Sequence, residues 1–118
     1  MKILVVDDSE AFRKVLAEFL VRAGFHEIAE ASNFEQAVEA FRASDPRFTF
    51  VDMILPGRSG VDLTKELLCI NPGAIIIAMS SIINKKLIQQ SLEAGAKDFL
   101  LKPTNEIALN SVLTMWSD

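Results

Sequence analysis

The sequence predicts an α/β protein built on a five-stranded parallel sheet that is doubly wound, with helices on both faces. Short apolar runs of strand length alternate along the chain with segments whose apolar residues recur at the helical period. Several of these runs are apolar throughout, which is typical of strands covered on both faces of a parallel sheet. Parallel strands with helical, right-handed crossovers are the arrangement that this alternation specifies.

The stretch Phe48–Asp52 is the clearest of the strand signals. Its apolar and β-favouring residues lead directly into the carboxylate of Asp52, and Pro56-Gly57 then predicts a turn. Asp52 is therefore expected at the carboxyl end of a buried strand, where open α/β sheets bind their ligands. A carboxylate in that place costs free energy unless it has a partner or a metal ion.

The chain begins with a strand signal at Lys2–Val6, which ends in Asp7, Asp8 and Ser9. Either Ser9 or Asp8 can cap the helix that follows. The apolar residues of this helix recur with the helical period, and they are Phe12, Val15, Leu16, Phe19 and Leu20. Gly24 suits the left-handed position at which the helix ends.

The second strand signal, Glu27–Ala31, has few aliphatic residues, so we expect this strand nearer an edge of the sheet. The range 32–35 has the spacing of a capping box at the start of the next helix. The apolar stripe of that helix consists of Phe34, Ala37, Val38 and Phe41. Asp45-Pro46 ends the helix before the central strand.

After Gly60, the second half of the chain repeats the pattern. A helix carrying Leu63, Leu67 and Leu68 ends at Asn71-Pro72-Gly73. Strands are predicted at Ala74–Met79 and Phe99–Leu101, with a helix over about Asn84–Ala94 between them. Thr104 or Asn105 can cap a final helix whose apolar residues are Ile107, Ala108, Val112, Leu113 and Trp116.

Composition limits the classes of protein that fit. A length of 118 residues suits one domain, residues 1–118, and half of the residues are apolar. No apolar stretch approaches the roughly 20 residues that span a bilayer, and the net charge of −4 disfavours direct nucleic-acid binding. The single cysteine, Cys69, excludes an internal disulfide. We therefore expect a cytoplasmic globular domain that does not contact the membrane.

Polar residues follow four of the predicted strands. They are Asp7-Asp8, Asp52, Ser80-Ser81 and Lys102, and the carboxyl ends of parallel strands share one edge of the sheet. Carboxylates brought together there require a compensating cation. Oxygen ligands without His or Cys favour Mg²⁺ or Mn²⁺, a lysine and a hydroxyl can hold a phosphoryl group, and an aspartate can be a nucleophile.

These residues, in this order, resemble the receiver domain of bacterial two-component response regulators, and chemotaxis regulators in particular. The resemblance covers essentially the whole chain: Asp7-Asp8 after the first strand, Asp52 and the Pro56-Gly57 turn with Gly60, Ser80 after the fourth strand, and Lys102-Pro103 after the fifth. It implies a flavodoxin-like fold with strand order 2-1-3-4-5.

The resemblance also implies a role for each of these residues. Asp52 would accept a phosphoryl group from a sensor histidine kinase or a phosphotransfer protein. Asp8 would be a direct Mg²⁺ ligand, Asp7 would act partly through water, and Asp52 and the backbone carbonyl of Ile54 would complete the protein ligands. Lys102 would pair with Asp52 and then with the phosphoryl group, which the Ser80 hydroxyl would also contact.

Phe99 stands at the position of the family's switch aromatic, although a core role is the plain alternative. The face formed by the fourth helix, fifth strand and fifth helix would signal to a downstream protein or output domain, and phosphorylation-dependent dimerisation is left open. Ile54 and Ile82 stand where the family's hydrolytic water passes, so we expect slow self-dephosphorylation. The apolar pair Ile82-Ile83 is expected to touch the partner.

The sequence leaves three other readings open. A Mg²⁺-dependent phosphohydrolase with an aspartyl nucleophile usually carries a second acid where this chain has Ile54. A flavin-binding module is disfavoured because Asp7-Asp8 would repel a phosphate. A pseudo-receiver used only for docking would not need the complete set of site residues. We therefore expect a signalling switch rather than a metabolic enzyme.

Trp116 and Cys69 are predicted to be packed helix residues, and His26 is predicted to have no functional role.

Overall fold

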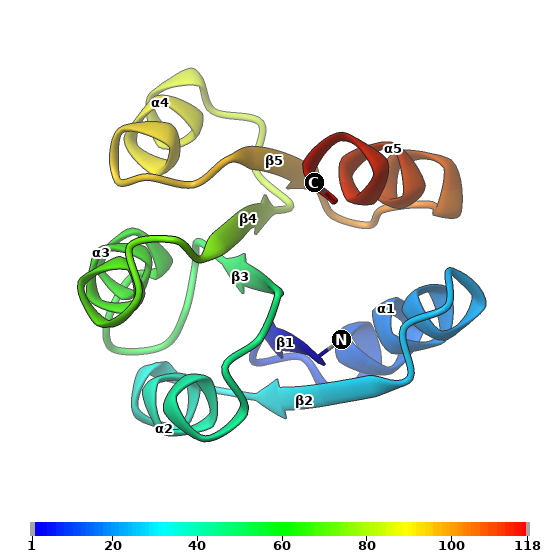
Figure 1. The fold of residues 1–118 in the computed structure, drawn as a ribbon. Helices are drawn as coiled ribbons and strands as arrows, with labels where there is room; N and C mark the ends of the chain where they lie inside the picture. The colour runs from blue at the N-terminus through cyan, green and yellow to red at the C-terminus, as the bar shows by residue number, and fades with distance from the viewer. Residues whose placement is uncertain (1, 118) are drawn as a thin grey trace.

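The computed structural model describes residues 2–117. Within this range strands and helices alternate in the predicted order (Figure 1). The strands are β1 (Lys2–Val6), β2 (Glu27–Ala31), β3 (Phe48–Asp52), β4 (Ile75–Ser80) and β5 (Asp98–Leu101). The helices are α1 (Glu10–Arg22), α2 (Phe34–Ser44), α3 (Gly60–Ile70), α4 (Lys85–Glu93) and α5 (Glu106–Trp116).

The five strands form one parallel sheet in the order β2-β1-β3-β4-β5. The fold class and the strand order are thereby confirmed. The aliphatic-poor strand β2 lies at an edge, as its composition predicts. Along each central strand the side chains alternate between two cores, because successive residues of a strand point to opposite faces of the sheet.

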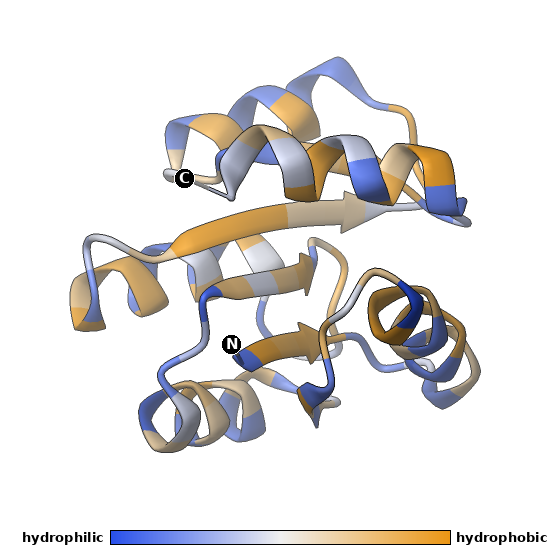
Figure 2. Cartoon of the chain, turned by 45° about the vertical axis from the view of Figure 1, so that its right-hand side comes forward, coloured by the Kyte–Doolittle hydropathy of each residue, from blue (hydrophilic) through white to orange (hydrophobic). Residues whose placement is uncertain are grey.

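The helices cover both faces of the sheet (Figure 1). Helices α1 and α5 pack on one face, against Ile3, Val5, Phe48, Phe50 and Leu100. Helices α2 and α3, with Leu87 of α4, pack on the other, against Leu4, Val6, Val51, Ile76 and Ala78. Figure 2 shows hydrophobic colours along the central strands, whereas the helices carry both hydrophobic and hydrophilic residues. The sheet is therefore the buried layer between two amphipathic layers.

Every helix begins with a side-chain cap, which fixes where the loops at the sheet edges end. The capping residues are Ser9, Asn33, Ser59, Asn84 and Asn105, and each accepts a backbone N–H from the first turn. Ser9 and Asn105 are among the predicted caps. The box at the start of α2 is one residue later than predicted, because the side-chain Oδ1 of Asn33 accepts from the Gln36 N–H while the Gln36 side-chain oxygen accepts from the N–H and the hydroxyl of Ser32.

Two burial predictions are wrong. Val15 is 46% exposed, because it lies at the rim of the α1 stripe whose centre is formed by Leu16 and Leu20. Cys69 is exposed rather than packed. It lies two residues beyond the buried Leu67, and this separation turns it about 200° around the helix, away from the sheet.

The prediction that Trp116 is a packed helix residue agrees with the structure. The Trp116 indole N–H donates to Asp98 Oδ2 at 3.1 Å, and its ring packs against the α1/α5 core. His26 is exposed in the loop before β2, away from the carboxyl ends of the strands. No helix within residues 2–117 is both long enough and apolar enough to cross a membrane.

Candidate functional site

The candidate site lies at the carboxyl edge of the sheet, and backbone hydrogen bonds fix the residues that build it. Asp7 N–H donates to Ala31 O at 3.0 Å, which extends the β1–β2 pairing by one residue. On the other side of the sheet, Lys102 N–H donates to Ser80 O at 2.8 Å. These two hydrogen bonds therefore continue the strand pairing to the residues just beyond the strands.

The alternation of side chains brings three of the predicted residues to one face. Each of them comes two positions after a strand residue of the α1/α5 core: Asp7 after Val5, Asp52 after Phe50, and Lys102 after Leu100. The period of a strand is two residues, so these three side chains continue the same face past the end of the core. Three residues that are distant in sequence thereby meet under the start of α1.

The Asp52 carboxylate is buried, with 4% of the residue exposed. Its Oδ1 accepts from Ile54 N–H at 3.0 Å and its Oδ2 accepts from Lys102 Nζ at 3.0 Å. Burial raises the pKa of Asp52 above its usual range, and the nearby charge of Asp7 adds to this. The hydrogen bonds from Ile54 and Lys102 act in the opposite direction without cancelling the shift.

Lys102 joins the two buried carboxylates. Its Nζ lies 2.5 Å from Asp7 Oδ2, and Asp7 is fully buried. Burial alone would lower the pKa of Lys102, but the hydrogen bonds and charges of Asp7 and Asp52 outweigh it and raise the pKa. The ammonium also lies 4.5 Å from the centre of the Phe12 ring, a cation–π contact from α1. The lysine is thus fully protonated and held in place.

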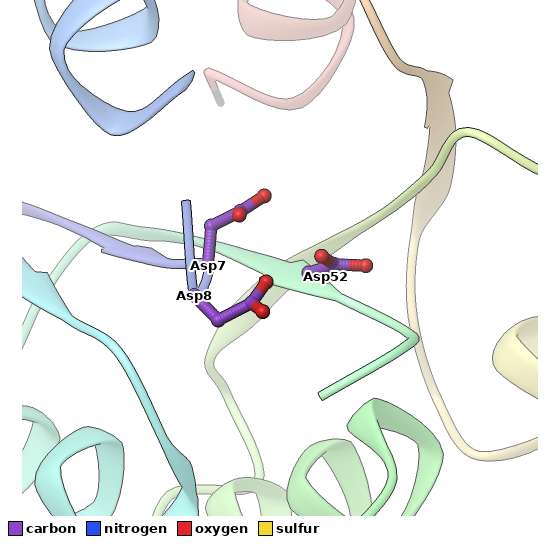
Figure 3. A group of neighbouring side chains, drawn as sticks. All are labelled: Asp7, Asp8 and Asp52. Atoms are coloured by element: carbon purple, nitrogen blue, oxygen red, sulfur yellow. The ribbon is translucent and has the colours of Figure 1, made fainter. Parts of the chain in front are cut away.

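Asp8 supplies a third carboxylate to the site. Asp7 and Asp8 come from the end of β1 and Asp52 from the end of β3 (Figure 3). One carboxylate oxygen from each of the three lies within 4.8 Å of the other two. Asp7 and Asp52 are buried, whereas Asp8 is exposed. The three carboxylates outnumber the single Lys102 ammonium, which pairs with Asp7 and Asp52, and so leave an excess of negative charge. This all-oxygen donor set fits Mg²⁺ or Mn²⁺.

Ser80 and Phe99 lie on the opposite side of the sheet from the charged residues. Ser80 comes two positions after Ala78, which packs on the α2/α3/α4 face, so the Ser80 side chain lies on the same face. Its buried hydroxyl oxygen accepts from Ile82 N–H at 3.1 Å. Phe99 is partly buried on the same face, and it pairs in register with Ala78 while Leu101 pairs with Ser80. The two predicted switch residues are thus diagonal neighbours, but the Ser80 hydroxyl makes no hydrogen bond to the described carboxylates or to Lys102.

Apolar side chains stand in the loops that follow β3 and β4. Ile54 is 52% exposed, Ile82 is 49% exposed and Ile83 is 79% exposed. The predicted exposure of the Ile82-Ile83 pair is therefore observed. Ile54 and Ile82, two positions beyond Asp52 and Ser80, thus expose apolar side chains to the solvent beside the site, and these side chains cannot form hydrogen bonds.

Gly60 sets the position of the Asp52 backbone. A Cβ atom at Gly60 would lie 2.2 Å from Asp52 O and 2.6 Å from Met53 Cα. The first residue of α3 therefore packs directly on the main chain of the phosphorylation-site candidate, and its N–H donates to Met53 O at 3.0 Å. The sequence pattern identifies this glycine, but the close approach itself is visible only in the structure.

Two contacts of the site lie outside the residues selected from the sequence. Ser9 N–H donates to Asp7 Oδ1 at 2.8 Å, and Arg13 Nη1 donates to the main-chain oxygen of Asp7 at 2.5 Å. The sequence pattern predicts Ser9 only as a helix cap. Arg13 gives no signal in the sequence, because a charged residue on an amphipathic helix is normally read as part of the solvent-exposed face.

The fold and the acidic edge define a class of doubly wound α/β proteins with a carboxylate-rich phosphate or metal site at the carboxyl ends of the strands. The model of the response regulator receiver domain family matches residues 3–114. The chain belongs to this family, the receiver domains of two-component response regulators, and it is similar to chemotaxis members of the family.

Three relatives show the extent of the similarity. The chemotaxis protein CheY of Thermotoga maritima is 34% identical over 102 residues, covering 86% of this chain and 85% of that protein. A Burkholderia pseudomallei response regulator with a phosphorylated aspartic acid and a calcium ion has a TM-score of 0.87 at 30% identity, covering 95% of this chain and 65% of that one. The CheX–CheY–BeF₃–Mg complex of Borrelia burgdorferi contains a chain with a TM-score of 0.90 at 25% identity, covering 98% of this chain and 88% of that one.

Proposed function

We propose that Asp52 is the phospho-acceptor of a Mg²⁺-dependent signalling switch. A carboxylate oxygen of Asp52 forms the bond to phosphorus while the bond from phosphorus to the donor imidazole nitrogen breaks. The electron pair stays with the imidazole, which takes up a proton from water. The observation that carries this proposal is the convergence of Asp7, Asp8, Asp52 and Lys102 at one edge of the sheet.

Asp8, Asp52 and the carbonyl of Ile54 are the groups that we assign to the metal ion. Asp7 suits a contact through water, because both of its carboxylate oxygens already accept hydrogen bonds, from Ser9 and Lys102. When bound, Mg²⁺ supplies positive charge that stabilises the phosphoryl oxygens. The related structures with Mg and BeF₃ or with calcium and a phosphorylated aspartate support this assignment by analogy.

Lys102, Ser80 and Phe99 are assigned to the response that follows phosphorylation. Lys102 is already 3.0 Å from Asp52 Oδ2, so a small movement brings its ammonium to a phosphoryl oxygen. Ser80 would exchange its contact with Ile82 for one to the phosphoryl group. The space that its movement leaves lies beside Phe99, on the same face of the sheet.

A titration with beryllofluoride and Mg²⁺ tests the proposal without any kinase. We expect saturable binding that changes the amide resonances of Ser80 and Phe99 in an NMR spectrum and the fluorescence of Trp116. Asp52→Asn should abolish the response. A wild-type protein whose spectrum does not change, or a variant that responds as the wild type does, would count against Asp52 as the acceptor.

The phosphorylated form should lose its phosphoryl group slowly, because Ile54 and Ile82 cannot orient a water molecule. Replacing Ile54 with Asn introduces a group that can hold water near the phosphorus, and positioned proton-transfer groups commonly contribute about 10²-fold or more. We expect hydrolysis about ten-fold faster in Ile54→Asn. The decay of the phosphorylated mass with Mg²⁺ present measures this, with Val21→Asn on α1 as the control, because Val21 is 44% exposed. A wild-type lifetime of seconds would contradict the prediction.

A sensor kinase or phosphotransfer protein would supply the phosphoryl group.

We propose that a downstream protein binds the α4/β5/α5 face and the loop before α4. The exposed Ile83 marks this surface, because an apolar side chain that is 79% exposed is available to a partner. Ile83→Lys should weaken partner binding about ten-fold or more without changing phosphorylation by acetyl phosphate. Equal retention of a partner by Ile83→Lys and the wild type in pull-downs from cells would remove this surface from the proposal.

A further inference from the structure

Arg13 connects three elements at the edge of the candidate site. It lies on α1, and only 14% of its side chain is exposed. Its Nη1 donates to the main-chain oxygen of Asp7 at 2.5 Å, and its Nε donates to Glu30 Oε1 on β2 at 2.8 Å. We infer that Arg13 is a positioning residue that holds the Asp7–Asp8 peptide group in the orientation that presents Asp8 to the metal ion. This inference rests on the metal assignment proposed above.

The orientation of this peptide group matters because Asp8 is otherwise weakly held. Asp7 is fixed through its N–H to Ala31 O and through both carboxylate oxygens. Asp8 is exposed, and among the contacts of residues 2–117 none holds its carboxylate. A peptide group is planar, so fixing the Asp7 carbonyl oxygen also fixes the nitrogen and Cα of Asp8. The direction of the Asp8 side chain follows from that backbone position.

The two hydrogen bonds use the shape of an arginine side chain. A guanidinium presents its donors in a rigid, planar fork, so the bond to Glu30 aims the bond to Asp7. A lysine carries the same charge on a flexible stem and lacks this fork. The role is therefore distinct from a general electrostatic effect of a cation near acidic groups, and the two can be separated by substitution.

Calorimetric titration with Mg²⁺ tests the inference directly. We expect Arg13→Gln and Arg13→Lys to bind Mg²⁺ about ten-fold more weakly than the wild type, as is usual when a residue that supports a metal ligand is removed. Lys14→Gln is the matched control. Lys14 is the neighbouring cation on α1, 69% exposed and paired with Glu10 at 3.3 Å, and its removal should change the affinity by less than about two-fold.

A second readout separates positioning from damage to the acceptor. With acetyl phosphate as donor, the variants should need more Mg²⁺ to reach half of the maximal phosphorylation rate, and the maximal rate itself should stay close to that of the wild type. Urea unfolding establishes that each variant is folded. Arg13→Lys keeps the charge and the aliphatic stem, so it serves as the test where Arg13→Gln fails to fold.

Each outcome decides between the possibilities. Wild-type affinity in Arg13→Gln would overturn the inference. Wild-type affinity in Arg13→Lys alone would show that the charge suffices and would equally overturn the positioning role. A lower maximal rate at saturating Mg²⁺ would place the defect at the acceptor instead. Failure of the wild type to bind Mg²⁺ would remove the metal assignment itself, and this result differs from the loss of affinity in the Arg13 variants.

Discussion

Replacing Gly60 with Ala should reduce the free energy of unfolding by about 3 kcal/mol or more, because overpacking against atoms that cannot move is among the costliest core changes. The added Cβ would lie 2.2 Å from Asp52 O and 2.6 Å from Met53 Cα. Both are main-chain atoms, so a rotamer change cannot relieve the clash. Either α3 moves outward or the end of β3 shifts, and the second response also displaces the Asp52 carboxylate.

Urea unfolding of Gly60→Ala beside Gly73→Ala checks this prediction. A Cβ at Gly73 would meet only the Asn71 side chain, at 3.4 Å, so the control should change stability by less than about 1 kcal/mol. Any Gly60→Ala protein that folds should also be phosphorylated more slowly by acetyl phosphate. Equal stabilities of the two variants would show that the helix start is not tightly packed on the acceptor strand.

Replacing Lys102 with Met should destabilise the metal-free protein by about 3 kcal/mol at neutral pH, because it leaves the carboxylates of Asp7 and Asp52 buried without their cation. Lys102 has 15% of its side chain exposed and lies within hydrogen-bond distance of both groups. Lys14→Met removes a cation whose ion pair is exposed, so that control should cost less than about 0.5 kcal/mol. Added Mg²⁺ should restore much of the stability of Lys102→Met.

The destabilisation should depend on pH with a definite sign. The pKa of Asp52 is raised in the folded wild type. The protonated Asp52 carboxyl group therefore favours the folded state at a pH below the pKa that this group has in the unfolded chain. This contribution to the free energy of unfolding is lost as the pH rises through the pKa of the folded state. Without Lys102 the pKa of Asp52 rises further, because a hydrogen bond and an opposite charge are gone. The difference between wild type and Lys102→Met in urea unfolding with EDTA should therefore be largest at pH 7 and shrink toward pH 4. A difference that grows toward pH 4 would contradict the assignment of Lys102 as the cation of this pair.

The sequence was sufficient to predict the sheet and the residues at its edge, because both depend on local patterns. The apolar run before Asp52 and the turn after it specify a buried strand with a carboxylate at its end, whatever the remaining chain does. Helix boundaries and caps agreed to within one or two residues. Val15 and Cys69 were misplaced because each has an apolar side chain, and side-chain type alone cannot distinguish the rim of a helix stripe from its centre.

The details that hold the site together could not be predicted, because they depend on distances between elements. Nothing in the pattern around Arg13 shows that it reaches the main chain of Asp7. The cation–π contact between Lys102 and Phe12 likewise joins residues that the sequence places in separate elements. The alternation of strand residues does explain afterwards why Ser80 lies on the same face of the sheet as Phe99 while Asp52 lies on the face of Lys102. The residues proposed for the switch and the proposed acceptor therefore lie on opposite faces.

The most direct test of Asp52 as the phospho-acceptor is the intact mass of the protein after incubation with acetyl phosphate and Mg²⁺. We expect the wild type to gain the mass of one phosphoryl group and to gain none when EDTA replaces Mg²⁺. The variant Asp52→Asn should gain none in either condition, and urea unfolding should show that it is folded. A wild type that stays unmodified, or an adduct that persists in Asp52→Asn, would contradict the assignment.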